Sequence, residues 1–378
     1  MSSSIPFNKA SIGQQEFGNI ARAVEDGHIS GNGPFTKEAE ELLQKIHSGS
    51  RSLLTTSCTH ALELSARLLD LSPGDEVIVP AFTFVSTASA YVWNGARPVF
   101  ADIRDDTLNM DLESAIDRMS SRTKAICLVH YAGVGADPRS FAKLCEDRGL
   151  TLIEDNAHGL GASYDGRNLG TFGSFSTLSF HETKNITCGE GGAIVLNDSN
   201  FIERAEILRE KGTNRSALSR GAVSKYTWLE NGSSWVPSDV LAAILVAQLA
   251  RLDEITRRRT SIWDRYQSEL HDWALSNDVR LPAIPEAAQH PAHIFHLRLP
   301  SEAQRSAFID FLRGYGIHAV FHYQSLNNSP AGRQAAPSYQ ACPVAEHVSE
   351  TLVRLPLYTN LTNDQVDHIV ETVQRFQT

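Results

Sequence analysis

Long apolar runs are missing from this sequence of 378 residues. None of its hydrophobic stretches approaches the roughly 20 consecutive apolar residues that an α-helix needs to cross a bilayer. The first residues, MSSSIPFNKA, also lack the apolar centre of a signal peptide. We therefore expect a soluble, cytoplasmic protein that has no membrane partner.

Cysteine is scarce, and a basic surplus is absent. The five cysteines contain no CxxC pair, so the spacing indicates neither a disulfide framework nor a zinc site, and we expect no metal. The formal net charge of −10 disfavours nucleic acid as a partner, because a polyanion needs a basic surface. An anionic small molecule is still compatible with this charge, because a few local N–H groups and cations can bind phosphate.

Several common ligand motifs are absent as well. There is no GxxxxGK phosphate loop, and the glycines of HGLGASYDG at 158–166 do not have the GxGxxG spacing that a nicotinamide oxidoreductase would use. The segment HETKN has Asn185 where a zinc-protease motif needs its second histidine. We find no internal repeat and no low-complexity segment.

What the sequence does contain is an alternation of strand and helix patterns. Short β-prone runs are separated by helical segments such as 137–148, and this order predicts right-handed βαβ units. We therefore expect an α/β fold with a mostly parallel central sheet flanked by helices. The runs lie at 53–57, 76–79, 99–101, 125–130 and 152–154.

A long helical pattern from Asp239 to Trp273 is the candidate bridge to a smaller α+β domain. The boundaries that it suggests are 1–250 for a large domain with an N-terminal arm and 251–378 for the small C-terminal domain. In the latter we expect strands at 293–299 and 318–321 and helices at 302–315, 344–353 and 363–374.

The segment 174–197 reads as a strand, a loop that carries Lys184, and a second strand. Most loop lysines are solvated and have no chemical role. An amine beside apolar strands can, however, lose its solvation, which lowers its pKa and makes it nucleophilic near neutral pH. The turn at 189–192 is rich in glycine, which lets the backbone approach a ligand closely.

Two further positions have the chemistry that such an amine would need. Ser57 and Thr59 stand at a helix start, where they either only cap the helix or also bind phosphate. Asp155 follows the strand 151–153 and is either a cap or a ligand-binding carboxylate at the ligand-binding edge of the sheet. Together with Lys184 they suit pyridoxal phosphate, which needs an amine, a carboxylate for its ring nitrogen and donors for its phosphate.

The sequence resembles the DegT/DnrJ/EryC1/StrS family of sugar aminotransferases, which have the fold type I of pyridoxal-phosphate enzymes. The resemblance covers nearly the whole chain. Within the family, SFHETKN, EKGTNRS and SKYTW are most similar to the dTDP-4-amino-4,6-dideoxygalactose transaminases. The other matching segments are IPFNKA, GHISGNGPFT, LTTSCTHALE, GDEVIVPAFTFVSTA, VHYAGV, IEDNAHG and AVFHYQSL.

The resemblance implies a role for each matching residue. Lys184 would be the catalytic residue that binds the cofactor as a Schiff base and moves a proton between its C4′ and C4 of the sugar. Asp155 would pair with the ring nitrogen, Phe84 would stack on the ring, and His158 would lie near its 3′ oxygen. The residues implied to hold the phosphate are Ser57, Cys58, Thr59 and Ser179.

A second set is implied to contact the nucleotide sugar or the subunit boundary, because members of the family form homodimers that share their active sites. Two departures from the family pattern affect this set. Val236 stands where many members have an asparagine that reaches the partner's phosphate, and Ser233 or Ser234 is our candidate replacement. The usual motif after HYxP is also altered at Ser325 to Asn327. The implied set comprises Ser30, Gly31, Lys211, Arg215, His322 and Tyr323.

The implied reaction transfers the amino group of L-glutamate to C4 of a dTDP-4-keto-6-deoxyhexose. The products would be 2-oxoglutarate and a dTDP-4-amino-4,6-dideoxyhexose, for which we expect the galacto configuration. Two alternatives stay open: a C3 aminotransferase that acts on a dTDP-3-keto-6-deoxyhexose, and a regulator that binds pyridoxal phosphate without catalysis. Lys184 argues against the dehydratase branch of the family, in which histidine replaces the lysine.

Overall fold

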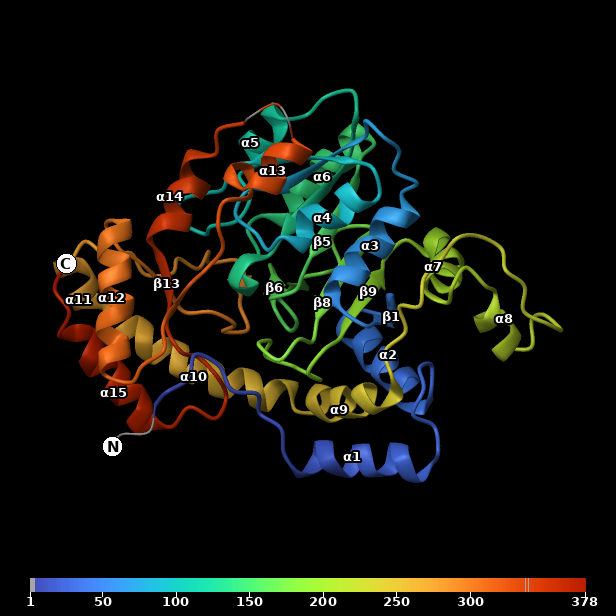
Figure 1. The fold of residues 1–378 in the computed structure, drawn as a ribbon, viewed down its shortest axis with the longest axis horizontal. Helices are drawn as coiled ribbons and strands as arrows, with labels where there is room; N and C mark the ends of the chain where they lie inside the picture. Colours follow the sequence, from blue (N-terminus) through green and yellow to red (C-terminus); the bar gives the residue numbers. More distant parts are fainter. Residues whose placement is uncertain (1–3, 337, 339) are drawn as a thin grey trace.

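The central feature of the computed structural model, which describes residues 4–336, 338 and 340–378, is a mixed β-sheet (Figure 1). Within these residues seven strands form it in the order β1-β9-β8-β5-β4-β2-β3. The strands are β1 (Arg51–Thr55), β2 (Glu76–Pro80), β3 (Arg97–Ala101), β4 (Thr123–Val129), β5 (Thr151–Asp155), β8 (Phe175–Ser179) and β9 (Gly192–Leu196).

The sheet is mostly parallel, as predicted. Strands β3, β2, β4, β5 and β8 pair in parallel, whereas β9 runs antiparallel to both β8 and β1. Strands β2 and β9 are buried along their whole length, because helices cover both faces of the sheet. The connection between β8 and β9 contains Lys184 and lies at the edge of the sheet where β8 ends and β9 begins.

Helices that pack around this sheet begin where the sequence supplies a cap. Ser57 accepts a hydrogen bond from the His60 N–H at the start of α3, and Asp111 and Asp137 cap α5 and α6 in the same way. These helices are α3 (Cys58–Leu68), α4 (Ser86–Trp93), α5 (Leu112–Asp117), α6 (Pro138–Arg148), α7 (Ile202–Arg209) and α8 (Arg215–Ser219), with short 3₁₀ turns η1 (Tyr131–Gly133) and η2 (Ser199–Phe201).

The remaining helices either pack beside the central sheet, as α2 does next to β1, or link the sheet to the C-terminal part and belong to it. Figure 1 shows α9 and α10 running along the lower side of the view toward α11, α12 and α15, with α1 below α9. These helices are α1 (Gln14–Glu25), α2 (Pro34–Ile46), α9 (Asp239–Ala250), α10 (Leu252–Glu269), α11 (His271–Ser276), α12 (Glu302–Gly314), η3 (Leu326–Asn328), α13 (Pro330–Ala335), α14 (Pro343–Thr351) and α15 (Asn363–Gln374).

Two small sheets complete the described part of the chain. The first joins β10 (Ala288–Gln289), β6 (Ser163–Tyr164) and β7 (Arg167–Asn168), and the second joins β11 (His296–Arg298), β13 (Leu352–Arg354) and β12 (Val320–Phe321). The β11–β13–β12 sheet shares a hydrophobic cluster with α10, α11, α12 and α15, and Ile5 near the N-terminus joins that cluster. The division at residue 250 stays a prediction.

The helix expected from Asp239 to Trp273 is wrong as one element, because α9, α10 and α11 replace it. The backbone leaves helical geometry at Arg251, whose φ and ψ are −103° and 9°. There the Arg251 side chain pairs with Glu16 of α1 and Glu254 of α10. The hydrophobic pattern of the sequence contains no information about this ion pair with α1. It therefore predicted one continuous helix across the break at Arg251.

The expected helix 344–353 ends at Thr351, and its last residues belong to β13. Leu352 and Val353 pair with β11, and Val353 also pairs with β12. The expected strands 293–299 and 318–321 are correspondingly short, because only 296–298 and 320–321 find partners. Strand pairing across the chain therefore overrides local helical preference here.

Asp239 fixes the start of α2 against α9, and its removal should destabilise the fold. Its buried carboxylate accepts hydrogen bonds from the Phe35 and Thr36 N–H groups and from the Thr36 hydroxyl. We predict that Asp239→Ala lowers the free energy of unfolding by about 2–4 kcal/mol, because three buried donors lose their acceptor. Asp264→Ala, at an exposed position of α10, should change it by less than about 0.5 kcal/mol in the same denaturant titration.

Candidate active site

The register of the central sheet brings the predicted site residues to one edge. Asp155 is the last residue of β5 and pairs with Thr177 of β8. Gly192 of β9 pairs with Ser179, the last residue of β8, and with Thr55, the last residue of β1. Because parallel strands end at the same edge, the segments that follow β1, β5 and β8 face a common space.

A cavity of about 980 Å³ lies at this edge. That volume is at the upper end of the range for small-molecule sites, so it can hold a cofactor together with a substrate. The cavity gathers every predicted cofactor residue and part of the predicted substrate set. The predicted residues that line it are Ser57, Cys58, Thr59, Phe84, Asp155, His158, Ser179, Lys184, His322 and Tyr323.

The start of α3 forms a cradle for an anion. Ser57 caps the helix through the His60 N–H at 3.1 Å, and the Thr59 and Ser86 hydroxyls lie 2.7 Å apart. Gly192 lets β9 approach this loop, since a Cβ there would lie 2.4 Å from the Cys58 nitrogen. Ser57 therefore caps α3, and the predicted phosphate role stays compatible with this cap because the N–H groups of the first turn suit an anion.

Asp155 is a buried carboxylate without a cationic partner. Its Oδ2 accepts a hydrogen bond from the Thr87 hydroxyl at 2.7 Å, and its Oδ1 accepts one from the Ala157 N–H at 3.3 Å. Burial raises the pKa of Asp155, although these hydrogen bonds and the charge of Lys184 oppose the rise. Within the described residues no cationic side chain forms an ion pair with Asp155, so a cationic ligand atom would be stabilised there.

Lys184 is an amine whose ionisation has been changed by its surroundings. Burial in the cavity wall lowers the pKa of Lys184 to about 8, and the charge of Asp155 only partly opposes this shift. The next residue, Asn185, anchors the loop through the Pro291 carbonyl at 2.7 Å and His293 Nδ1 at 2.8 Å. The cavity therefore presents a rigidly held amine that is partly neutral near physiological pH.

Neutral histidines and tyrosines form another part of the cavity wall. His158 Nδ1 accepts a hydrogen bond from the Ala132 N–H at 3.3 Å, so its proton lies on Nε2, 3.4 Å from the Tyr323 hydroxyl. His322 Nδ1 lies 2.7 Å from the Tyr131 hydroxyl. Burial holds the pKa of both histidines well below the ordinary value, and each can therefore position a ligand without adding charge.

Two aromatic residues at the cavity depart from regular geometry. Phe84 lies just before α4, which begins at Ser86, and it is 54% exposed at the cavity wall. Its centroid lies 6.2 Å from that of Tyr323. Tyr323 has a φ of 53°, a left-handed conformation that a bulky residue adopts only when its surroundings enforce it.

The remaining predicted residues do not line this cavity. Lys211 is exposed beside the Ser233 carbonyl, and Arg215 begins α8, which extends away from the sheet on the right of Figure 1. Gly31 packs against Val236, where a Cβ would lie 2.4 Å from the valine side chain. These residues, with Ser30 and the exposed Ser233 and Ser234, belong to surfaces outside the cavity, and their assigned roles stay predictions.

The residues at this edge fit pyridoxal phosphate. Lys184 supplies an amine with a lowered pKa, and Asp155 supplies a buried carboxylate that forms no ion pair among the described residues. The start of α3 and Ser179 supply N–H and hydroxyl donors that suit the phosphate.

Comparison with known proteins identifies the family. The model of the DegT/DnrJ/EryC1/StrS aminotransferase family matches residues 10–374. The chain belongs to this family. It is therefore a pyridoxal-phosphate-dependent sugar aminotransferase, and the predicted enzyme class and cofactor are confirmed. Among the described residues of this aminotransferase, no helix has the length and apolar character of a membrane span.

Solved structures of similar aminotransferases confirm the fold class. The aminotransferase TlmJ from Streptoalloteichus hindustanus is 30% identical, with a TM-score of 0.90 and 98% of each chain covered. The sugar aminotransferase Spr1654 from Streptococcus pneumoniae, in its pyridoxamine-phosphate form, is 29% identical over 98% of each chain, with a TM-score of 0.90. The synthase of 3-amino-5-hydroxybenzoic acid is also 29% identical over 98% of each chain, with a TM-score of 0.89.

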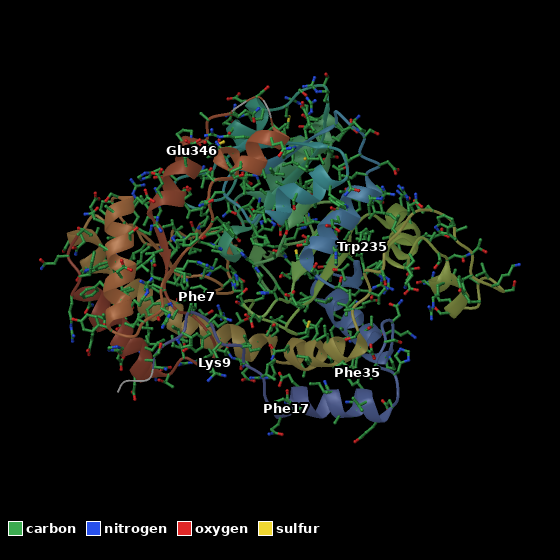
Figure 2. All side chains as sticks on the ribbon, viewed as in Figure 1. Phe7, Lys9, Phe17, Phe35, Trp235 and Glu346 are labelled. Carbon is green, nitrogen blue, oxygen red and sulfur yellow. The ribbon has the colours of Figure 1, made fainter. Side chains whose placement is uncertain are left out.

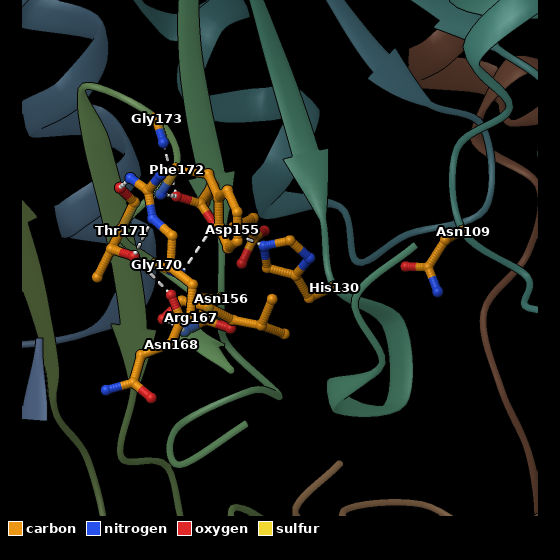
Figure 3. Close-up of polar contacts among 12 residues, drawn as sticks. Asn109, His130, Asp155, Asn156, Arg167, Asn168, Gly170, Thr171, Phe172 and Gly173 are labelled. Atoms are coloured by element: carbon orange, nitrogen blue, oxygen red, sulfur yellow. Dashed lines mark hydrogen bonds and ion pairs between the residues drawn. The ribbon is translucent and has the colours of Figure 1, made fainter. Parts of the chain in front are cut away.

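Sequence reasoning missed a buried polar network behind the catalytic edge. Glu154, next to Asp155, accepts hydrogen bonds from the N–H groups of Gly170, Phe172 and Gly173, and its Oε2 lies 2.8 Å from His130 Nε2 (Figure 3). Burial alone would raise the pKa of Glu154, but these partners hold it below its ordinary value. The network fixes the loop between β5 and β8, and an acid inside an apolar strand was its only sequence signal.

Sequence reasoning also missed residues that line the cavity from distant segments. Phe7 and Asn8 reach it from the N-terminal arm, and Asn8 donates a hydrogen bond to the Glu182 carbonyl at 3.0 Å. Figure 2 shows Phe7 between the sheet and the C-terminal helices. Arg354 reaches the same cavity from β13. Only tertiary packing brings these residues together, because about 350 positions separate them in the chain.

The lowered pKa of Lys184 predicts an unusual pH dependence of its reactivity. Only the neutral amine is nucleophilic, so acetylation of Lys184 in cofactor-free protein should rise with a midpoint near pH 8. Mass spectrometry after short pulses of acetic anhydride measures this rise, and the exposed Lys143 of α6 serves as an internal reference. A midpoint for Lys184 near the free-lysine value of about 10.4 would contradict the desolvation argument.

Proposed function

We propose that this aminotransferase moves the amino group of L-glutamate to C4 of a dTDP-4-keto-6-deoxyhexose. The products would be 2-oxoglutarate and a dTDP-4-amino-4,6-dideoxyhexose with the galacto configuration. Support for the sugar comes from the segments 179–185, 210–216 and 224–228, which resemble the transaminases of that product. The relative Spr1654, a sugar aminotransferase, supports the same class.

The observation that carries the proposal is the meeting of Lys184, Asp155 and the start of α3 in one cavity. Pyridoxal phosphate, when bound, supplies an aldehyde that carries the amino group and a ring that withdraws electrons. Lys184 Nζ would take a proton from Cα of glutamate and later return one to C4 of the sugar. A pKa of about 8 suits this double task, because the amine can then release and accept a proton near neutral pH.

The other residues of the cavity would position these atoms. Asp155 would hold the proton on the ring nitrogen, while Ser57, Thr59 and Ser179 would hold the phosphate. The Nε2–H of neutral His158 would be available as a hydrogen-bond donor to the 3′ oxygen of the ring. This arrangement keeps the ring fixed while the proton moves at a single atom, Nζ of Lys184.

We also propose a homodimer, in which the residues outside the cavity act on the partner's site. An exposed position is what such a role requires, and Ser30, Lys211 and Arg215 are exposed in the single chain. Many family members use an asparagine to reach the partner's phosphate, and Val236 stands at its position here. Ser233 or Ser234 would take over that contact. Gly31 would allow the loop that carries Ser30 to lie close to Val236.

The direct test is incubation with dTDP-4-keto-6-deoxyglucose, L-glutamate and pyridoxal phosphate. We predict formation of one amino sugar with its nitrogen on C4, identified by NMR couplings of the sugar ring. Lys184→Ala should lower turnover by at least about 1000-fold and remove the visible absorption band of the bound cofactor, because both depend on the same amine. Lys143→Ala, at an exposed position, is the matched control.

Other outcomes would select the alternatives. The protein would be a C3 aminotransferase if a dTDP-3-keto-6-deoxyhexose gave a product with nitrogen on C3 and the 4-keto sugar did not react. A bound cofactor whose absorption does not respond to glutamate would favour a regulator without catalysis. Turnover by Lys184→Ala equal to that of the natural protein would contradict the assignment of the amine.

A further inference from the structure

Arg354 is a guanidinium in the cavity wall that forms no ion pair with any residue that the structure describes. Its Cζ lies 4.5 Å from the centre of the Phe7 ring, and Nη2 reaches the Phe321 carbonyl only at 3.4 Å. Its Nε is buried and has no hydrogen-bond partner among the described residues. The acids that line the cavity, Asp155 and Glu190, form no ion pair with it in the described part of the chain.

Arg209 and Arg298 also leave Nε without a hydrogen-bond partner among the described residues, but their terminal nitrogens bind carboxylates. Arg209 pairs with Glu40 at 2.7 Å, and Arg298 pairs with Asp105 at 2.7 Å. Arg259, which has no carboxylate beside it, donates instead to two backbone carbonyls at 3.1 and 2.8 Å. An unpaired charge inside a protein costs free energy, so the unpaired guanidinium in the cavity indicates an anion that arrives with a ligand.

The position of Arg354 favours the amino donor as the source of that anion. Arg354 and Lys184 line the same cavity, so the guanidinium and the reacting amine face a common space. In an amino acid the α-carboxylate is bonded to the same carbon as the amino group that is transferred. In a nucleotide sugar, by contrast, the diphosphate is on C1, across the ring from C4. A fixed guanidinium also binds a carboxylate through two parallel hydrogen bonds.

We propose that Arg354, supported by the Phe7 ring, binds the α-carboxylate of the amino acid donor. The inference rests on the proposed aminotransferase reaction and assigns the donor subsite within it. Phe7 belongs to the N-terminal arm, which Ile5 ties to residues 316–318 by two backbone hydrogen bonds of 2.8 and 3.0 Å. The arm and β13 thus build the donor subsite together, opposite the sheet edge that would hold the cofactor.

The two half-reactions separate this role from a general one. For Arg354→Gln, the glutamate concentration that half-saturates the loss of the cofactor's visible band should rise about 10- to 100-fold, the loss expected for a charged hydrogen bond. Reaction of the amino form of the enzyme with the keto sugar should change by less than about twofold. Arg305→Gln is the matched control, because Arg305 stacks on Phe321 at 6.0 Å without lining the cavity.

A change of ligand tests the same contact from the other side. Isoglutamine has an amide in place of the α-carboxylate, so it should react equally weakly with the natural enzyme and with Arg354→Gln. Glutamine keeps the α-carboxylate and should still distinguish the two. Arg354→Lys, which keeps a cation, should recover part of the glutamate affinity and shows whether loss of charge or loss of folding is responsible.

Several results would overturn the assignment. If Arg354→Gln impaired only the half-reaction with the keto sugar, Arg354 would bind the diphosphate instead. If both half-reactions of Arg354→Gln matched those of the natural enzyme, Arg354 would bind neither ligand. Calorimetric titration with glutamate separates the proposal from the function on which it rests. Binding that is lost in Arg354→Gln, without turnover of any keto sugar by the natural protein, would refute the function and keep the carboxylate site.

Discussion

Burial of two opposite groups in one cavity is the constraint on which the site depends. Desolvation raises the pKa of Asp155 and lowers the pKa of Lys184, so it favours the neutral form of both. The charge of each group partly opposes the pKa shift of the other. A ligand with a cationic ring nitrogen and an anionic phosphate would favour the charged forms of Asp155 and Lys184 in this cavity. The pocket is therefore organised for a charged cofactor before any cofactor binds.

The sheet creates that constraint through a single register. Gly192 pairs with the last residues of β1 and β8, and its missing side chain allows the Ser57–Cys58 backbone to lie against β9. Behind this edge, the hydrogen bonds of Glu154 hold the loop from Gly170 to Gly173. Backbone geometry thus fixes the start of α3, and the buried Glu154 fixes the neighbouring loop.

Much of this arrangement could be predicted from the sequence, because its signals are local. Strand runs, helix caps, Lys184 in its glycine-flanked loop and Asp155 at a strand end all lie within short windows. Thr87, Arg354 and Phe7 could not be predicted, because their importance arises only when distant segments meet. The break at Arg251 and the strand β13 were not predicted for the same reason. An ion pair with α1 accompanies the break, and pairing with β11 defines the strand, and neither contact is visible in local periodicity.

The most direct test of the account is a crystal structure of the protein grown with pyridoxal phosphate and then reduced with borohydride. The account predicts a covalent bond from the cofactor to Nζ of Lys184 and a ring nitrogen within hydrogen-bond distance of Asp155. It also predicts a phosphate held at Ser57 to Thr59 and Ser179. A cofactor bonded to another lysine, or a phosphate distant from the start of α3, would contradict the account.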